Sequence, residues 1–160
     1  EGVYGNALRV HGVPARQVIE QACPGLPDAI SNDGSGLLAS ELLGRFVPAA
    51  LEQFDSIPQN VVAYLGCTHY GYQADRFKSA LQAFVPEVRV LNPNKGAVDT
   101  ILSRLKTEPG DGSFSVRFVT RYVIPDVVIK SLSVYIGERA PDTLLALKTF
   151  THLPGLCGEL

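Results

Sequence analysis

The feature that most constrains the fold is the stretch of residues 60–69. Residues 61–65 read Val-Val-Ala-Tyr-Leu, and Gly66, Cys67, Thr68 and His69 follow directly. An almost continuous apolar run of this length is typical of a parallel strand covered on both faces. Open α/β sheets place functional residues at the carboxyl ends of their strands. We therefore predict a buried strand over 60–65 whose end presents a thiol, a hydroxyl and an imidazole.

The apolar periodicity of the first hundred residues alternates between the helix period and the strand period. It predicts helices over about 1–11, 36–54, 74–84 and 95–105 and strands over 16–22, 60–65 and 87–91. This alternation indicates an α/β fold, a three-layer α/β/α arrangement with a mainly parallel sheet. Right-handed crossovers would bring Cys23 and Cys67 to one edge of that sheet.

Local signals refine these elements. Pro24 and Gly25 suit a strand-to-helix turn, and residues 27–31 predict at most a short helical turn. Ser35 is a plausible N-cap for the helix that follows. Pro48 is expected to kink or break that helix.

A composition shift at residues 107–112, which read Thr-Glu-Pro-Gly-Asp-Gly, divides the chain. We predict an α/β domain over 1–106 that carries the motif, and a tail over 107–160. The tail is expected to contain a strand over 115–120 and a helix over 126–136. Residues 141–160 are rich in Leu and Phe, so we expect the tail to pack on the sheet or on a partner chain.

Composition excludes several classes of protein. The net charge is −2 without a basic block, which argues against nucleic acid as a partner. No apolar run is long enough to span a membrane, and we predict no membrane association. Three widely spaced cysteines, Cys23, Cys67 and Cys157, suggest neither a disulfide framework nor a zinc site. We expect no metal and no cofactor, and a reducing cytoplasm as the location.

The triplet at the predicted strand end has a plausible chemistry. A thiolate at Cys67 is a compact base whose pKa a neighbouring imidazole, such as His69, or a helix N-terminus can tune. The amide and hydroxyl of Thr68 suit a substrate carboxylate. A cysteine at a strand end is more often a small buried apolar residue, so the surrounding motif decides the interpretation.

The remaining candidate residues have simpler interpretations. Cys23 is expected to be structural, packed under its turn, and Cys157 incidental. Asp33 lies in a loop-forming stretch and is expected to be a turn residue. His11 and His152 are expected at the surface or satisfied locally.

The motif Leu65–Tyr70, which reads LGCTHY, resembles the signature of the aspartate/glutamate racemase superfamily, and most of all that of glutamate racemase. Residues 21–24, Gln-Ala-Cys-Pro, resemble the family's upstream ACP segment. Tyr4 in an opening helix and the turn at Asn92-Pro93 also agree. The resemblance covers roughly residues 1–138 and matches only the C-terminal half of such an enzyme.

The resemblance implies an isomerase that interconverts L- and D-glutamate by thiol-based transfer of the α-proton, without a cofactor, for peptidoglycan synthesis. It assigns Cys67 as one of two catalytic cysteines, His69 as its assistant and Thr68 as a substrate contact. The other catalytic cysteine belongs to the N-terminal half. This chain, which contains no methionine, is therefore expected to be a fragment, inactive or half-active unless a partner completes the site.

Departures from the family pattern leave alternatives open. Gly71 stands where the family commonly has Pro, and Ser31 stands where it commonly has Glu, with Asp33 close by as a substitute. One alternative is another superfamily enzyme, of the aspartate racemase, hydantoin racemase or maleate isomerase type. The other is a non-catalytic interaction module of the same fold. The expected partners are a small amino-acid substrate and either a second copy or the missing N-terminal half.

Overall fold

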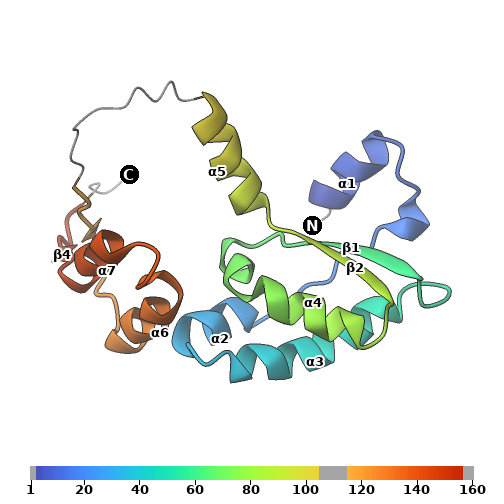
Figure 1. The fold of residues 1–160 in the computed structure, drawn as a ribbon, viewed down its shortest axis with the longest axis horizontal. Helices are drawn as coiled ribbons and strands as arrows, with labels where there is room; N and C mark the ends of the chain where they lie inside the picture. Colours follow the sequence, from blue (N-terminus) through green and yellow to red (C-terminus); the bar gives the residue numbers. More distant parts are fainter. Residues whose placement is uncertain (1–2, 105–114, 157–160) are drawn as a thin grey trace.

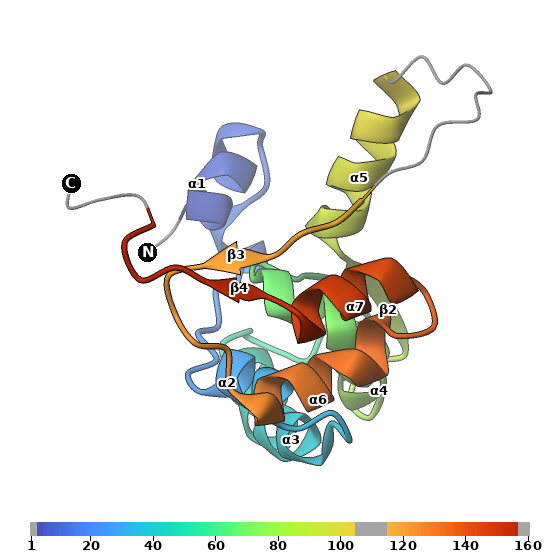
Figure 2. The same ribbon diagram turned by 90° about the vertical axis from the view of Figure 1, so that its left-hand side faces the viewer.

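A computed structural model of the chain describes residues 3–104 and 115–156, and it shows a mixture of helices with small parallel sheets (Figures 1 and 2). The helices are α1 (Val3–Val10), α2 (Leu26–Asn32), α3 (Leu37–Leu51), α4 (Ala74–Gln82), α5 (Pro93–Arg104), α6 (Asp126–Ile136) and α7 (Pro141–Lys148). The strands are β1 (Asn60–Tyr64), β2 (Glu87–Leu91), β3 (Val119–Thr120) and β4 (Thr151–His152). Two 3₁₀ helices are η1 (Ala15–Gln17) and η2 (Thr68–Gln73). The α/β class is confirmed.

The main sheet consists of β1 and β2, which pair in parallel from Asn60 opposite Glu87 to Tyr64 opposite Leu91. Both strands lie where the sequence predicts them. One further hydrogen bond, from the Leu65 amide to the Leu91 carbonyl at 3.0 Å, extends the ladder past Tyr64. In the tail, β3 and β4 form a second parallel pair. The predicted strand over 115–120 is reduced there to its last residues.

The core lies on one side of the main sheet, where α3 and α4 cover it and α2 packs beside them (Figure 1). Its buried members are Leu26, Ile30, Ala39, Leu43, Val47, Leu51, Leu65, Phe77, Leu81 and Val85. Alternate residues of the strands, such as Ala63 and Val90, turn toward this cluster. Burial of these apolar side chains is the main stabilising term for the fold.

The opposite face of the sheet is largely open, which corrects the prediction that β1 is covered on both faces. Val62 is 61% exposed and Tyr64 is 45% exposed. Helix α1 contacts this face through Tyr4, whose ring centroid lies 4.9 Å from that of Tyr64. Helix α5 projects away from the sheet (Figure 1) and leaves Ile101 58% exposed. Within the described residues, a third layer is therefore not confirmed.

The predicted strand over 16–22 is wrong. The segment begins as η1, and no strand follows it before α2. The backbone of Val18 is extended, with φ −120° and ψ 108°. In the described ranges, however, no strand pairs with it. The segment is held by other contacts, including the Glu20 carboxylate, which accepts a hydrogen bond from the Gly5 amide at 2.9 Å.

Two helices are longer or more regular than predicted. Helix α2 begins directly after Gly25, which has a φ of +77°, and it buries Leu26 and Ile30 completely. Helix α3 runs through Pro48, so a break at this residue is wrong, and the alternative of a kink stays a prediction. Val47, adjacent to the proline, is buried in the core, and its burial offsets the amide hydrogen bond that a proline cannot make.

The start of α3 is capped differently from the prediction. Gly36, with a φ of +72°, occupies the N-cap position. Asp33 accepts hydrogen bonds from the Ser35 amide and from the Leu38 amide, both at 2.9 Å. Ser35 makes a longer contact, in which its hydroxyl accepts from the Leu37 amide at 3.3 Å. Asp33 is thus a turn and capping residue.

The tail helix α6, which is where the sequence predicts it, packs on α2 and η2. The Ser131 hydroxyl donates to the Ile30 carbonyl at 3.0 Å, and Gln73 Nε2 donates to the Tyr135 hydroxyl at 2.6 Å. The Tyr135 ring also stacks on Tyr72, with centroids 5.0 Å apart. The proposed boundary at 107–112 and Cys157 both lie outside the described residues, so the division into domain and tail stays a prediction.

No helix in the described ranges combines the length and the apolar character that a membrane span requires.

The core assignment predicts a large difference between two leucines of α3. Leu43 is 1% exposed and Leu37 is 71% exposed. Leu43→Ala should lower the free energy of unfolding by about 2–5 kcal/mol, because it leaves a cavity in the core. The matched variant Leu37→Ala should change it by less than about 0.5 kcal/mol. Urea denaturation followed by circular dichroism measures both, and equal losses would contradict the assignment.

Candidate active site at the end of β1

Cys67 and His69 lie together where the chain leaves β1. Cys67 has an extended backbone, with φ −125° and ψ 140°, and immediately precedes η2. The tight turn of η2 brings the Cys67 Sγ and the His69 Nδ1 to 3.6 Å. Both side chains are half-buried. The expected thiol–imidazole pair is therefore present, at a distance that permits a sulfur–nitrogen hydrogen bond.

Thr68 lies between them with its side chain exposed. Its carbonyl accepts a hydrogen bond from Asn94 Nδ2 at 3.1 Å. The backbone amide of Asn94 donates to Asn92 Oδ1, also at 3.1 Å. The turn after β2 thus supports the triplet after β1. The hydroxyl of Thr68 remains available to solvent or to a substrate.

The structure explains why glycine stands at position 71, one of the departures from the family pattern. A Cβ atom at this position would lie 2.5 Å from Asn92 Nδ2. Only glycine therefore allows the end of β2 to approach η2 this closely without a shift. The same holds less strictly at Gly66, where a Cβ atom would lie 3.2 Å from a ring carbon of Tyr4. Tyr4 thus covers the residue that precedes Cys67.

Tyr70, the last residue of the motif, lies beside Cys23. It packs on the core together with Cys23, and its ring lies 5.3 Å from that of Phe77. Burial, together with the charges that Cys23 and Cys67 carry as thiolates, raises the pKa of Tyr70 to about 12. The Tyr70 hydroxyl thus stays protonated at neutral pH beside both thiols.

Cys23 is not at the end of a strand, because its predicted strand does not form. Its thiol is half-buried and its Sγ lies 3.7 Å from the Gln21 carbonyl. Burial raises the pKa of the Cys23 thiol, and the adjacent Tyr70 hydroxyl offsets only part of this effect. Cys23 is therefore a neutral thiol at physiological pH, which agrees with the expected structural role.

Other candidate residues lie elsewhere. Asp33 caps α3, and hydrogen bonds from Ser35 and the Leu38 amide lower the pKa of its carboxyl. In the described part of the chain, no hydrogen bond links Asp33 to His69. His11 is exposed, as is His152, whose Nε2 lies 3.1 Å from the Arg121 carbonyl.

Among the described residues, no cluster of His, Cys, Asp or Glu side chains is arranged to hold a metal ion.

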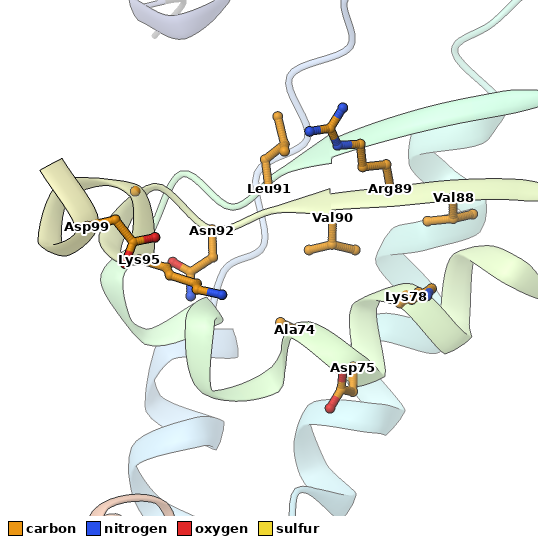
Figure 3. Close-up of a pocket in the computed structure, with 11 residues that line it drawn as sticks. Ala74, Asp75, Lys78, Val88, Arg89, Val90, Leu91, Asn92, Lys95 and Asp99 are labelled. Atoms are coloured by element: carbon orange, nitrogen blue, oxygen red, sulfur yellow. The ribbon is translucent and has the colours of Figure 1, made fainter. Parts of the chain in front are cut away.

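A groove of about 720 Å³ lies beside the site, between the outer edge of β2 and the helices α4 and α5 (Figure 3). Its lining includes Asn92, the residue that approaches Gly71, and a mixture of charged side chains. Cys67, Thr68 and His69 do not line it. The groove is therefore adjacent to the thiol–imidazole pair and separate from it.

Sequence reasoning missed the supporting residues of the site. Tyr70 is the sixth residue of the motif, but nothing in its local sequence points to Cys23. For the two asparagines after β2, the sequence predicts only a turn. Gln73 is 4% exposed, and its bond to Tyr135 joins residues far apart in the chain. Such contacts leave no periodic signal in the sequence.

Taken together, a thiol and an imidazole at the carboxyl end of a parallel strand define a cysteine-based candidate active site on an α/β scaffold. Sequence comparison with known proteins identifies relatives of this chain. A glutamate racemase of Ruegeria sp. strain TM1040 is 36% identical over 103 residues, which are 64% of this chain and 35% of that protein. A glutamate racemase of Roseobacter denitrificans is 36% identical over 115 residues, which are 71% of this chain and 39% of that protein.

A third glutamate racemase, from Dinoroseobacter shibae, is 34% identical over 103 residues, 64% of this chain and 34% of that protein. The chain thus spans little more than a third of the length of these relatives. No family model matches it, and no solved structure matches it at a significant level. The chain contains a segment related in sequence to the glutamate racemases.

The different surroundings of the two thiols predict an order of alkylation. In a Cys157→Ser background at neutral pH, iodoacetamide should modify Cys67 several-fold faster than Cys23, since only the thiolate reacts and burial raises the pKa of Cys23. The rate at Cys23 should rise as the pH passes 9. Peptide mass spectrometry measures both rates, with Cys23→Ser and Cys67→Ser as controls. Faster labelling of Cys23 at neutral pH would contradict this order.

The raised pKa of Tyr70 predicts that the folded chain loses stability at alkaline pH. Its pKa is about 12 in the folded chain, against an ordinary value of 10.0. Between these values the folded state binds more protons than the unfolded state, so the free energy of unfolding must fall as the pH rises. Tyr70→Phe should show a smaller fall between pH 9 and pH 12 in urea denaturation. An identical fall in both proteins would exclude Tyr70 as its source.

Proposed function

We propose that this chain is part of a cofactor-independent, glutamate racemase-like enzyme, in which it supplies one of two acid/base groups that exchange the α-proton. The observation that carries the proposal is the Cys67–His69 pair at 3.6 Å, within a segment related to the glutamate racemases. The product would be D-glutamate, which serves peptidoglycan synthesis.

The proposed step is a proton transfer at the α-carbon. The Cys67 thiolate takes the α-proton from one face of the amino acid, and the electron pair stays on the substrate as a carbanion stabilised by its carboxylate. His69, hydrogen-bonded to the sulfur at 3.6 Å, is placed to accept the thiol proton before the transfer. Returning a proton from Cys67 to the same face regenerates the starting enantiomer. Inversion requires a donor on the opposite face.

Cys23 is a poor candidate for that second donor. Its thiol is packed beside Tyr70 and on the core, and burial disfavours the thiolate form that a second base must reach. The groove contributes charged groups, but no further thiol, among its lining residues. We therefore propose that the second group comes from outside the described residues and that this chain alone exchanges the α-proton of one enantiomer.

Thr68 has the role of a carboxylate contact in this proposal. Its hydroxyl is exposed next to the reactive thiol, and Asn94 holds its backbone in place through the 3.1 Å bond to its carbonyl. A substrate carboxylate bound here would present the α-carbon near the Cys67 sulfur.

Proton exchange in heavy water tests the proposal. The chain is incubated with L-glutamate, D-glutamate and both enantiomers of aspartate, and the α-proton signal is followed by NMR. We expect exchange on one glutamate enantiomer without racemisation, and a loss of at least about 100-fold in Cys67→Ser. Cys23→Ser serves as the matched control and should retain the rate.

Three results would count against the proposal. Exchange that persists in Cys67→Ser removes Cys67 as the base. Absence of exchange in the unmodified chain removes the working half-site. Faster exchange with aspartate than with glutamate would transfer the assignment to another enzyme of the superfamily.

A further inference from the structure

The 3₁₀ helix η2 sets the position of His69 relative to Cys67. Cys67 is its N-cap residue, and His69 is the second of its six residues. Helices of this kind have poorer hydrogen-bond geometry than α-helices, and runs longer than about 3–4 residues are uncommon. The shape of η2 therefore depends on contacts from outside the helix, and so does the 3.6 Å distance from Cys67 Sγ to His69 Nδ1.

Residues from two other parts of the chain hold the two ends of η2. At its start, Asn94 Nδ2 donates to the Thr68 carbonyl at 3.1 Å. At its end, Gln73 is 4% exposed, and its Nε2 donates to the Tyr135 hydroxyl at 2.6 Å. This second contact comes from α6, 62 positions away in the chain. One end of η2 is thus fixed from the turn after β2, and the other is fixed from the tail.

Tyr135 is itself held firmly in place. Its ring stacks on Tyr72, with centroids 5.0 Å apart, and its hydroxyl donates to the Asp33 carbonyl at 3.4 Å. Helix α6 also packs on α2 (Figures 1 and 2), where the buried Ser131 hydroxyl donates to the Ile30 carbonyl at 3.0 Å. This anchor does not involve η2, so the hydroxyl of Tyr135 is presented to Gln73 from a fixed helix.

The burial of Gln73 makes this contact more important than a hydrogen bond at the surface. A buried polar group that loses its partner carries the full cost of its desolvation. Without the Tyr135 hydroxyl, the Gln73 amide must turn toward water, and the end of η2 must move with it. His69 lies on the same short helix, and small displacements of an acid/base group cost much of its catalytic effect.

We propose that Tyr135 is a positioning residue for the candidate active site, which acts through Gln73 and η2 to hold His69 against Cys67. Neither Tyr135 nor Gln73 is assigned a contact with the substrate. The tail helix α6 is then a support of the site. The catalytic importance of the Cys67–His69 pair rests on the proposed function, whereas the support of η2 by Tyr135 does not.

Tyr135→Phe tests this role, because it removes the hydroxyl and retains the ring that stacks on Tyr72. In ¹H–¹³C NMR spectra it should shift the ring cross-peak of His69, which is assigned by its loss in His69→Gln. Hydrogen exchange of the Tyr70 amide, which donates to the Cys67 carbonyl at 3.1 Å, should become at least about tenfold faster. The kcat for α-proton exchange on glutamate should fall at least about tenfold, with KM changed less than about threefold.

Ser131→Ala is the matched control. It removes a buried hydrogen bond of α6 that goes to α2 and not to η2. The His69 cross-peak, the exchange of the Tyr70 amide and the kcat should all remain as in the unmodified chain. Far-UV circular dichroism confirms that each variant is folded.

A second background separates the two partners of the Tyr135 hydroxyl, Gln73 and Asp33. Gln73→Met removes the buried amide and retains a side chain of similar length. If Tyr135 acts through Gln73, Tyr135→Phe should change the exchange of the Tyr70 amide and the kcat by less than about threefold in this background.

Four outcomes would overturn the proposal. The first is a Tyr135→Phe variant whose His69 cross-peak and Tyr70 exchange are unchanged. The second is a Ser131→Ala variant that shows the same changes as Tyr135→Phe. The third is the full effect of Tyr135→Phe in the Gln73→Met background, and the fourth is an active chain whose kcat does not respond to Tyr135→Phe. A chain without any α-proton exchange would instead overturn the proposed function, and the two NMR measurements would then decide the role of Tyr135 alone.

Discussion

The hydrogen bond from the Leu65 amide to the Leu91 carbonyl is the constraint on which the site depends. It is the last bond of the parallel ladder and fixes where both strands end. Leu65 is 2% exposed, so the core holds this rung in place. Beyond it, Cys67 leaves one strand while Asn92 leaves the other, and the two turns contact each other. A shift of register by one residue would reverse every side chain of the strand and carry the thiol to the opposite face.

The sequence predicts the elements whose signals are local. The bounds of β1, β2 and α6 follow from apolar runs and breakers within a few residues, and the structure confirms them. The predicted strand over 16–22 has the right composition, but a strand also needs a neighbour, and none of the described strands reaches it. Pro48 shows the opposite error, since a local rule predicted a break that burial of neighbouring Val47 overrides. The third layer is not confirmed for a similar reason, because periodicity shows that α5 has an apolar face without showing what covers it.

The candidate site also contains some contacts that the local sequence predicts and others that it does not. Cys67 and His69 are close in sequence, so a single tight turn was enough to predict their proximity. The position of Cys23 beside Tyr70 depends on how the segment before α2 folds back on the core, which local patterns do not encode. The hydrogen bond between Gln73 and Tyr135 joins residues 62 positions apart in the chain and connects η2 to α6. The bond gives the buried Gln73 amide a partner, which a polar group in an apolar setting requires.

The turn after β2 holds the triplet after β1 in place. The Asn92 side chain lies against Gly71, where a Cβ atom would come within 2.5 Å of its Nδ2, and its Oδ1 accepts a hydrogen bond from the Asn94 backbone amide at 3.1 Å. Asn94 Nδ2 in turn donates to the Thr68 carbonyl at 3.1 Å. The backbone between Cys67 and His69 is therefore fixed from β2, which contributes no reactive group of its own. The position of the thiol depends on where β2 ends as much as on where β1 ends.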